Sequence, residues 1–115
     1  MSIFINNKRD TDYGIYCGRG SVLGNKYLIG RDGTRSEVCA KYRVWLWDEF
    51  KKRGKVYNEI LRLANLYRAK GTLSLLCFCA PLQCHTEHIR SLILWVVSNN
   101  FFPPGATFEK VDETL

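Results

Sequence analysis

The sequence lacks an apolar run long enough to cross a membrane. Near the carboxyl end, the longest aliphatic and aromatic run is Leu92–Val97, whereas a membrane-spanning helix needs about 20 apolar residues. The first ten residues, MSIFINNKRD, contain no apolar signal-peptide core and no small-residue cleavage pattern. We therefore expect no secretory signal, no membrane contact and a cytoplasmic location.

A disulfide pattern is lacking as well. The chain has five cysteines, an odd number, and their spacings do not resemble the framework of a small secreted domain. No C-x-x-C redox motif is present. These absences favour free thiols in a reducing compartment.

What the sequence does contain is the composition of one globular domain. Apolar residues make up 46% of its 115 residues and charged residues 24%, which allows a single hydrophobic core and argues against disorder. No repeat divides the chain, so we expect a single domain over residues 1–115. The segment 103–115 is expected to form an acidic tail or an edge strand.

Hydrophobic periodicity predicts strands that alternate with helices. Thr34 and Glu37 form a capping box that opens a helix. Gly54 and Gly71 are expected to end two successive helices, and Pro81 to break the last strand. The predicted strands are residues 2–5, 13–17 and 72–79, with a short extended piece at 27–29, and the predicted helices begin near residues 35, 56 and 86. We therefore predict a small layered α/β domain with a short, partly parallel sheet packed with about three helices.

A glycine-rich loop joins the second predicted strand to the first helix. Residues 18–33 contain five glycines, which allow backbone N–H groups to converge on an anion. Arg19 can hold a phosphate or carboxylate through two parallel hydrogen bonds. Arg35 lies in the first turn of the next helix, where a cation is unfavourable unless an anion binds nearby. The alternative interpretation is a surface loop with incidental arginines, because the spacing matches neither a Walker A loop nor a complete G-x-G-x-x-G.

The segment CFCAPLQCH, residues 77–85, concentrates thiols and an imidazole. We expect no bound metal, because the C-x-C spacing is unusual for zinc and the consecutive Cys84 and His85 are expected to point apart. Cys77 is explained as a small buried strand residue. Ligands of open α/β sheets bind beyond the carboxyl ends of the strands. Cys84, His85 and Glu87 are therefore predicted to form one side of a polar pocket.

These segments resemble a family of phage and bacterial proteins. YGIYCGRGSVLGN, GTRSEVCAKYRVWL and LSLLCFCAPLQCHTEHI are similar to the family's pattern of I-G-R-x-S-x-x-G-N, a G-x-R at a helix start, and L-x-C-x-C-x-P-x-x-C-H-G-D. The family is that of domain of unknown function 4326, and the resemblance covers about residues 12–96. It implies a phage or prophage source, and so the cytoplasm of a host cell.

The sequence departs from the family pattern at a few positions. Cys17 stands for isoleucine, Val22 and Lys26 stand for prolines, and Thr86-Glu87 stands for Gly-Asp. The last change keeps a carboxylate but loses a glycine. Because the family has no assigned activity, the resemblance supports the position of the site and not its chemistry.

Together these features predict one pocket between the glycine-arginine loop and the start of the last helix. Its predicted ligand residues are Gly18, Arg19, Gly20, Ser21, Gly24, Asn25, Arg35, Cys84, His85 and Glu87. We expect Arg19 and Arg35 to hold the phosphate of an anionic, nucleotide-like small molecule, with no cofactor. Binding without turnover is favoured, for example to sequester a host signalling nucleotide.

Two other functions stay open. As an enzyme, the protein would transform a nucleotide with His85 as base or Cys79 as nucleophile. As a nucleic-acid-binding module, it would use its net charge of +6 and exposed aromatic side chains. Against the second, the three tryptophans lie in helical patterns that are typical of core residues. A homo-oligomer is compatible with each of these functions.

Overall fold

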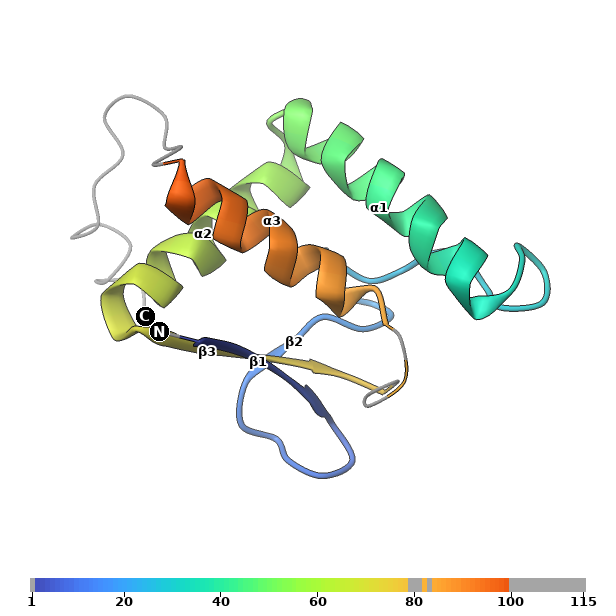
Figure 1. The fold of residues 1–115 in the computed structure, drawn as a ribbon, viewed down its shortest axis with the longest axis horizontal. Helices are drawn as coiled ribbons and strands as arrows, with labels where there is room; N and C mark the ends of the chain where they lie inside the picture. Colours follow the sequence, from blue (N-terminus) through green and yellow to red (C-terminus); the bar gives the residue numbers. More distant parts are fainter. Residues whose placement is uncertain (1, 79–81, 83, 100–115) are drawn as a thin grey trace.

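The computed structural model describes residues 2–78, 82 and 84–99. Strands and helices alternate over this part of the chain (Figure 1). The elements are β1 (Ser2–Asn7), β2 (Ile15–Tyr16), α1 (Arg35–Lys51), α2 (Lys55–Lys70), β3 (Thr72–Cys77) and α3 (Thr86–Ser98). This confirms the predicted α/β class with three helices and a small sheet. The acidic segment 103–115 and the predicted end of the last strand, Cys79–Pro81, lie outside the described residues.

The sheet has three strands in the order β1-β3-β2, and both pairings are parallel. The pairing of β1 with β3 runs from Ser2 opposite Thr72 to Asn7 opposite Cys77. The much shorter β2 pairs only with Leu75 and Leu76 of β3. β2 is therefore shorter than predicted, and the expected extended piece at 27–29 forms no strand. No signal in the sequence marks this difference, because a short edge strand is defined by its partner rather than by its own residues.

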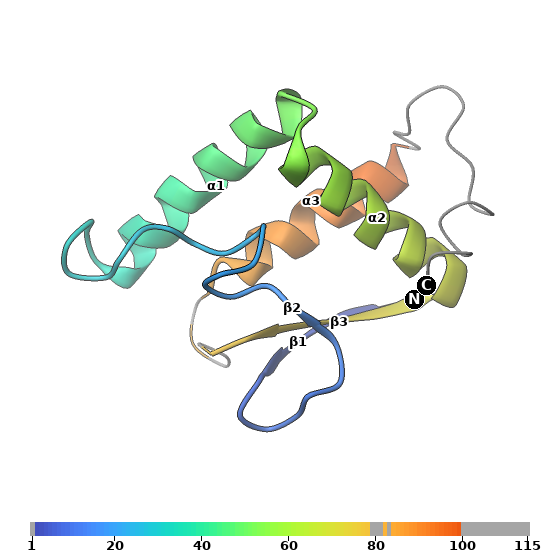
Figure 2. The ribbon, with the colours of Figure 1, turned by 180° about the vertical axis from the view of Figure 1, so that it is seen from behind.

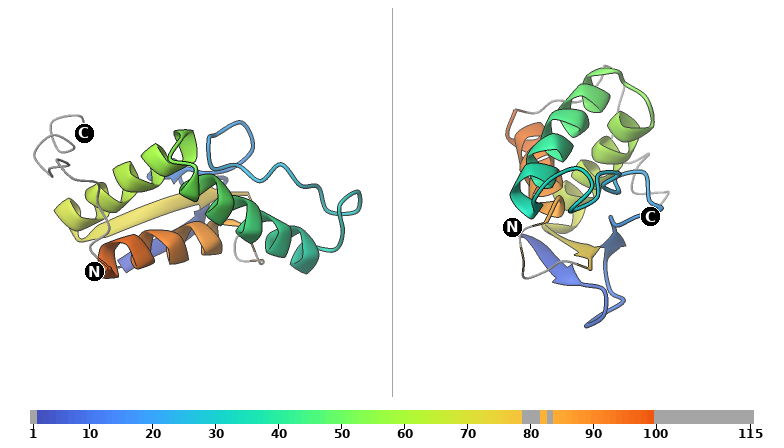
Figure 3. Two further views of the ribbon diagram at one scale, coloured as in Figure 1. Left: turned by 90° about the horizontal axis from the view of Figure 1, so that it is seen from above. Right: turned by 90° about the vertical axis from the view of Figure 1, so that its right-hand side faces the viewer.

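The helices cover one face of the sheet, and the connection of residues 8–14 passes below the other face (Figure 1). The edge-on view in Figure 3 shows the same two layers. On the lower face Leu76 is only 1% exposed, and Gly14 lies so close that an added Cβ would meet the Leu76 side chain at 3.1 Å. The continuous apolar character of β3 is therefore explained by helices above it and a loop below it.

Local signals in the sequence account for the helix boundaries. The Thr34 hydroxyl accepts a hydrogen bond from the Glu37 N–H at 3.3 Å, and the Glu37 carboxylate accepts one from the Thr34 N–H at 2.9 Å. This confirms the predicted capping box, which satisfies N–H groups that the first turn leaves without partners. Gly71 ends α2 in the left-handed conformation, with φ of 78°, and donates its N–H to the Tyr67 carbonyl. α1 ends at Lys51, before Gly54.

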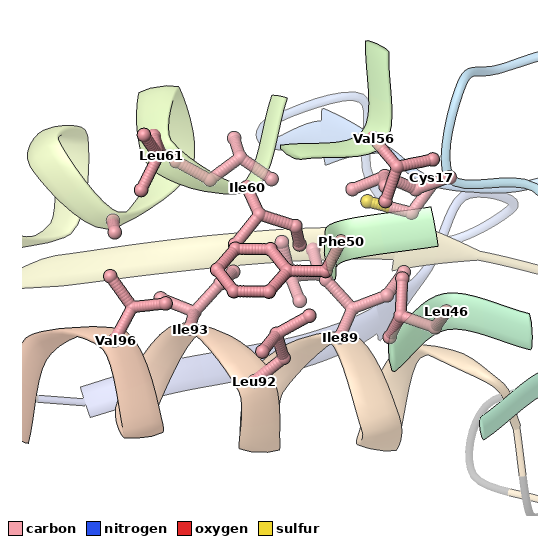
Figure 4. Packing of buried hydrophobic residues seen from close by; sticks show 14 of the residues in the cluster. Cys17, Leu46, Phe50, Val56, Ile60, Leu61, Ile89, Leu92, Ile93 and Val96 are labelled. Atoms are coloured by element: carbon pink, nitrogen blue, oxygen red, sulfur yellow. The ribbon is translucent and has the colours of Figure 1, made fainter. Parts of the chain in front are cut away.

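The core lies between the helices and the upper face of the sheet. Each helix contributes a stripe of apolar side chains at helical spacing, as the close view in Figure 4 shows. Side chains that are completely buried include Tyr42, Leu46, Ile60, Leu63, Leu75, Ile89, Leu92, Ile93 and Val96. Burying each aliphatic side chain of this size contributes about 1.5–3 kcal/mol. Trp45 and Trp47 pack against this cluster, whereas Trp95 is 38% exposed.

The arrangement of α1 positions the site. Seen from above, α2 and α3 run along the two sides of β3, whereas α1 extends beyond the carboxyl end of that strand (Figure 3). Residues 18–33 run from the end of β2 to the start of α1 along the same end of the molecule (Figure 2). The glycine-arginine loop, the first turn of α1 and the connection into α3 therefore meet at one edge of the sheet. Among the described residues, no helix combines the length and the apolar character that a membrane crossing requires.

Candidate functional site

The glycine-arginine loop is held in place by contacts within itself and by the core. The Ser21 hydroxyl donates to the Gly18 carbonyl at 2.6 Å, and Gly24 packs so closely on the same carbonyl that a Cβ would clash with it. Leu23, only 2% exposed, anchors the loop in the core, and its carbonyl accepts a hydrogen bond of 2.6 Å from the Tyr42 hydroxyl. Burial raises the pKa of Tyr42, so this hydroxyl keeps its proton and stays a donor. Backbone bonds and one buried side chain thus define the shape of the loop.

A cavity of about 330 Å³ opens between this loop, the start of α1 and the connection from β3 into α3. We call it the site cavity. Its described lining residues are Tyr16, Gly18, Arg19, Asn25, Tyr27, Ile29, Arg35, Val38, Cys39, Phe78, Cys84 and His85. Gly18, Arg19, Asn25, Arg35, Cys84 and His85 are predicted ligand residues, and the fold brings them to one place. They come from segments almost 70 positions apart in the chain: His85 bonds to the carbonyl of Cys17, 68 positions away.

Other predicted ligand residues do not line the cavity. Gly20, Ser21 and Gly24 belong to the loop that carries Arg19, and Gly20 adopts a φ of +90° that favours glycine. Glu87 lies in the first turn of α3, where its carboxylate accepts a hydrogen bond from the Cys84 N–H at 2.9 Å. This carboxylate therefore holds the backbone just before α3. Cys79, the nucleophile expected for an enzyme, lies outside the described residues.

The lining combines positive charge with aromatic rings. Arg19 and Arg35 are its two cations, and among the described lining residues none carries a carboxylate. Arg19 donates to the Asn25 carbonyl at 3.4 Å, which directs its side chain along the loop. Tyr16 contacts Phe78 edge to face, with 5.9 Å between the ring centroids. An anion attached to a flat ring system matches this combination of groups.

Cys84 and His85 form the floor of the site cavity and touch each other. The Cys84 Sγ lies 3.3 Å from the His85 Nδ1, and the His85 Nε2 lies 2.6 Å from the Cys17 carbonyl oxygen. A carbonyl only accepts, so Nε2 carries the proton and donates, and Nδ1 accepts from the Cys84 thiol. The expectation that these consecutive side chains point apart is wrong. The turn that precedes α3, held by the bond from the Cys84 N–H to the Glu87 carboxylate, directs both side chains toward the same interior.

The surroundings of His85 favour its neutral form. Burial lowers the pKa of His85 below its ordinary value of 6.5, the hydrogen bond to Cys17 opposes this shift, and the Arg19 cation adds to it. The ring is only 7% exposed and packs edge to face on Tyr42, with 4.9 Å between the centroids. A neutral imidazole whose Nδ1 faces a thiol is able to accept a proton at neutral pH.

Comparison with known proteins assigns the chain to a family. The family model described as "Domain of unknown function (DUF4326)" matches residues 5–95. The chain belongs to this family. The DUF4326 match includes both segments that line the site cavity, and it confirms the resemblance seen in the sequence. No curated protein and no solved structure matches the chain.

Within the DUF4326 region, sequence reasoning missed half of the lining. Tyr16, Tyr27, Ile29, Val38, Cys39 and Phe78 all face the cavity. Val38 and Cys39 follow the helical period of α1, which predicts core residues. Tyr16 and Phe78 lie in segments that are predicted to be strands. Phe78 and Ile29 are 54% and 53% exposed. Ile29 lies within the glycine-arginine loop and Phe78 within the CFCAPLQCH segment, so a large apolar side chain inside each predicted site segment was the signal available in the sequence.

Proposed function

We propose that this protein binds an anionic, nucleotide-like small molecule in the site cavity. The observation that carries the proposal is the lining itself: Arg19 and Arg35, no described carboxylate, and three aromatic rings in one cavity of about 330 Å³. Sites for small ligands are typically about 300–1,000 Å³ and combine an apolar lining with a few convergent polar groups. A cavity at the lower end of this range suits a single nucleotide rather than an oligonucleotide.

The two arginines account for the anionic part of the ligand. Each guanidinium can make two parallel hydrogen bonds to a phosphate. Arg35 is the first residue of α1, where the helix dipole disfavours a cation by a few tenths to about 1 kcal/mol. A phosphate bound beside it would offset this cost. The position of Arg35 at the start of α1 therefore fits a bound phosphate.

The rings and Asn25 account for the remainder of the ligand. A nucleobase has two flat faces, and aromatic side chains stack on such faces in a sequence-tolerant manner. The rings of Tyr16, Tyr27 and Phe78 line the cavity beside the arginines. The Asn25 side-chain oxygen accepts from the Tyr27 N–H at 2.9 Å, which orients the amide so that its NH₂ group can donate to a sugar or base.

Binding measurements on Arg19 variants test this proposal. We expect at least one member of a panel of adenine and guanine mono-, di- and triphosphates to bind by isothermal titration calorimetry. Arg19→Ala should weaken that binding by about 10- to 100-fold, because a hydrogen bond to a charged group contributes about 1.5–3 kcal/mol. The melting temperature should change little, because this arginine is exposed.

Arg31→Ala is the matched control. Arg31 belongs to the same loop but pairs with Asp32 at 2.9 Å and does not line the cavity. Its loss should leave nucleotide affinity unchanged. Equal losses for Arg19→Ala and Arg31→Ala, or tighter binding of a single-stranded oligonucleotide with a steep dependence on salt, would contradict the proposal and favour a nucleic-acid-binding surface.

A further inference from the structure

The thiol and the imidazole on the floor of the site cavity are more than binding a nucleotide requires. Cys84, only 2% exposed, lines the cavity and places its Sγ 3.3 Å from the His85 Nδ1. The Cys17 carbonyl holds the opposite ring nitrogen at 2.6 Å. A nucleophile beside a base, with the base oriented by a third group, is the arrangement that activates a cysteine for covalent chemistry.

The other described cysteines are placed differently. Cys39 also lines the cavity, but both ring nitrogens of His85 are engaged by Cys84 and by the Cys17 carbonyl. Burial raises the pKa of Cys17 itself to about 12, so its thiol stays protonated at neutral pH. Cys77 accepts a hydrogen bond from the Thr86 hydroxyl at 3.8 Å and does not line the cavity. Among the described cysteines, Cys84 alone is both in the cavity and bonded to this imidazole.

We propose that Cys84 is a nucleophile that attacks the phosphorus of a phosphate ester or anhydride in the bound ligand, with His85 as its base. This inference rests on the proposed function, because it needs an anionic ligand in the site cavity. The two arginines favour phosphorus over a carbonyl carbon as the electrophile. Their positive charge can neutralise the oxygens of a phosphoryl group during the reaction, and the described lining has no carboxylate that would repel them.

The reaction balances with water as the only co-reactant. The Cys84 Sγ–H proton passes to the His85 Nδ1 while sulfur attacks phosphorus. The S–P bond forms, the P–O bond to the leaving group breaks with its electron pair on oxygen, and Nδ1 returns the proton to that oxygen. Water then attacks phosphorus and gives a proton to Nδ1, the S–P bond breaks with its electron pair on sulfur, and sulfur regains the proton. The net change is hydrolysis of one P–O bond.

One substitution tests the nucleophile and another tests the base. Cys84→Ser removes the sulfur and keeps the volume and a hydroxyl donor toward Nδ1. His85→Gln removes the base at Nδ1 but keeps an amide N–H that can donate to the Cys17 carbonyl. Cys77→Ser is the matched control, because it changes a buried thiol that does not line the cavity. Circular dichroism and melting curves for the three variants identify any that fail to fold.

The experiment incubates each protein with the adenine and guanine mono-, di- and triphosphates and with cyclic 3′,5′-AMP, a phosphodiester. Products are followed by phosphate release and chromatography, and acid-quenched protein is mapped by mass spectrometry for phosphate on Cys84. We expect turnover of one or more of these compounds by wild type and by Cys77→Ser. Cys84→Ser should lose turnover and the phosphopeptide, and His85→Gln should be about 10²- to 10⁴-fold slower.

Alkylation rates and nucleotide binding distinguish a failure of this inference from a failure of the proposed function. Iodoacetamide should modify Cys84 faster than Cys39 in wild type, and His85→Gln should slow the modification of Cys84 but not that of Cys39. Wild type that binds a nucleotide but returns it unchanged would overturn this inference and leave the proposed function intact. Turnover that survives Cys84→Ser would also overturn it. Absence of nucleotide binding by calorimetry, in wild type and in folded variants alike, would overturn both.

Discussion

Two cavities lie toward opposite ends of β3, and they differ in chemistry more than in size. The site cavity, at the carboxyl end, measures about 330 Å³, whereas a second cavity near the amino end measures about 460 Å³. The second is lined by Phe4, Tyr13, Gly14, Ile15, Arg62, Leu66, Lys70, Thr72, Leu73 and Ser74. Its Arg62 pairs with Glu59 at 2.7 Å, and its described lining has no cysteine or histidine. Volume alone would select the second cavity, whereas the convergence of reactive groups at the carboxyl ends of the strands favours the site cavity, on which the proposed function rests.

The two cavities also differ in how closely their walls pack against the hydrophobic core. The floor of the site cavity is continuous with the hydrophobic core, since His85, 7% exposed, packs on the completely buried Tyr42. The walls of the second cavity include Tyr13, which is 84% exposed, and Phe4, which is 53% exposed. The site cavity therefore depends on the packing of α1 and α3, whereas the second lies along an open edge of a short sheet.

The largest expected effect is on the free energy of unfolding, and it tests whether the floor of the site cavity is part of the core. Tyr42→Ala should cost about 3–5 kcal/mol in the free energy of unfolding, because it leaves a cavity in the core and removes the donor to the Leu23 carbonyl. Tyr13→Ala at the second cavity should stay within about 0.5 kcal/mol. Urea denaturation followed by circular dichroism measures both. A cost below about 1 kcal/mol for Tyr42→Ala would show that the floor is not part of the core.

Two glycine substitutions, one beside each cavity, should reduce the free energy of unfolding by similar amounts. Gly24→Ala would push a Cβ against the Gly18 carbonyl, and Gly14→Ala would push one to 2.8 Å from the Ser74 carbonyl at a φ of +139°. Each change should cost about 1–3 kcal/mol. Calorimetry with the tightest-binding nucleotide should show weaker binding for Gly24→Ala only, since that glycine shapes the loop that carries Arg19. Weaker binding for Gly14→Ala instead would place the ligand in the second cavity.

Lowering the pH should reduce the stability of the fold, because His85 in the floor of the site cavity is buried in its neutral form. The pKa of His85 is lowered, mainly by burial, from its ordinary 6.5. The unfolded chain therefore binds more protons than the native state below about pH 6.5, and stability is lost as pH falls through this range toward the native pKa. Melting temperatures between pH 7.5 and 5 should show a smaller acid loss for His85→Gln than for wild type. Some loss should persist, because burial also lowers the pKa of His88; identical profiles would contradict this account.

The smallest expected effect concerns metal. In residues 2–78, 82 and 84–99, no three His, Cys, Asp or Glu side chains are grouped so that they could hold a metal ion. We therefore expect EDTA to leave the melting temperature unchanged and elemental analysis to find no stoichiometric zinc. About one zinc per chain, with unfolding by chelator, would instead assign Cys84 and His85 to a structural site and end the contrast in chemistry between the cavities.

How far the sequence predicted this structure depends on the range of each signal. The Thr34 capping box and the Gly71 stop are local, because neighbouring residues satisfy the helix ends, and both are found. The meeting of Arg19 with His85 was predictable because parallel strands end at one edge of a sheet. The contact between Cys84 and His85 was not, since it depends on how the turn before α3 is buried against α1 and the loop.

Glu87 was similarly hard to place from the sequence. A carboxylate three residues beyond Cys84 is equally compatible with a ligand contact and with a bond to the backbone, and the structure shows the bond to the Cys84 N–H. The aromatic lining was missed for a related reason. Tyr16 lies in a strand and Phe78 directly follows one, and rings at such positions usually pack in a core. Their exposure at one cavity is a property of the tertiary fold.

The most direct test of the central claim is a crystal structure with the tightest-binding nucleotide of the panel, obtained with Cys84→Ser so that any reaction is blocked. We expect the phosphate against the guanidinium groups of Arg19 and Arg35, with the base among the rings of Tyr16, Tyr27 and Phe78. A ligand seated in the second cavity near Tyr13, or phosphate bound away from both arginines, would contradict it.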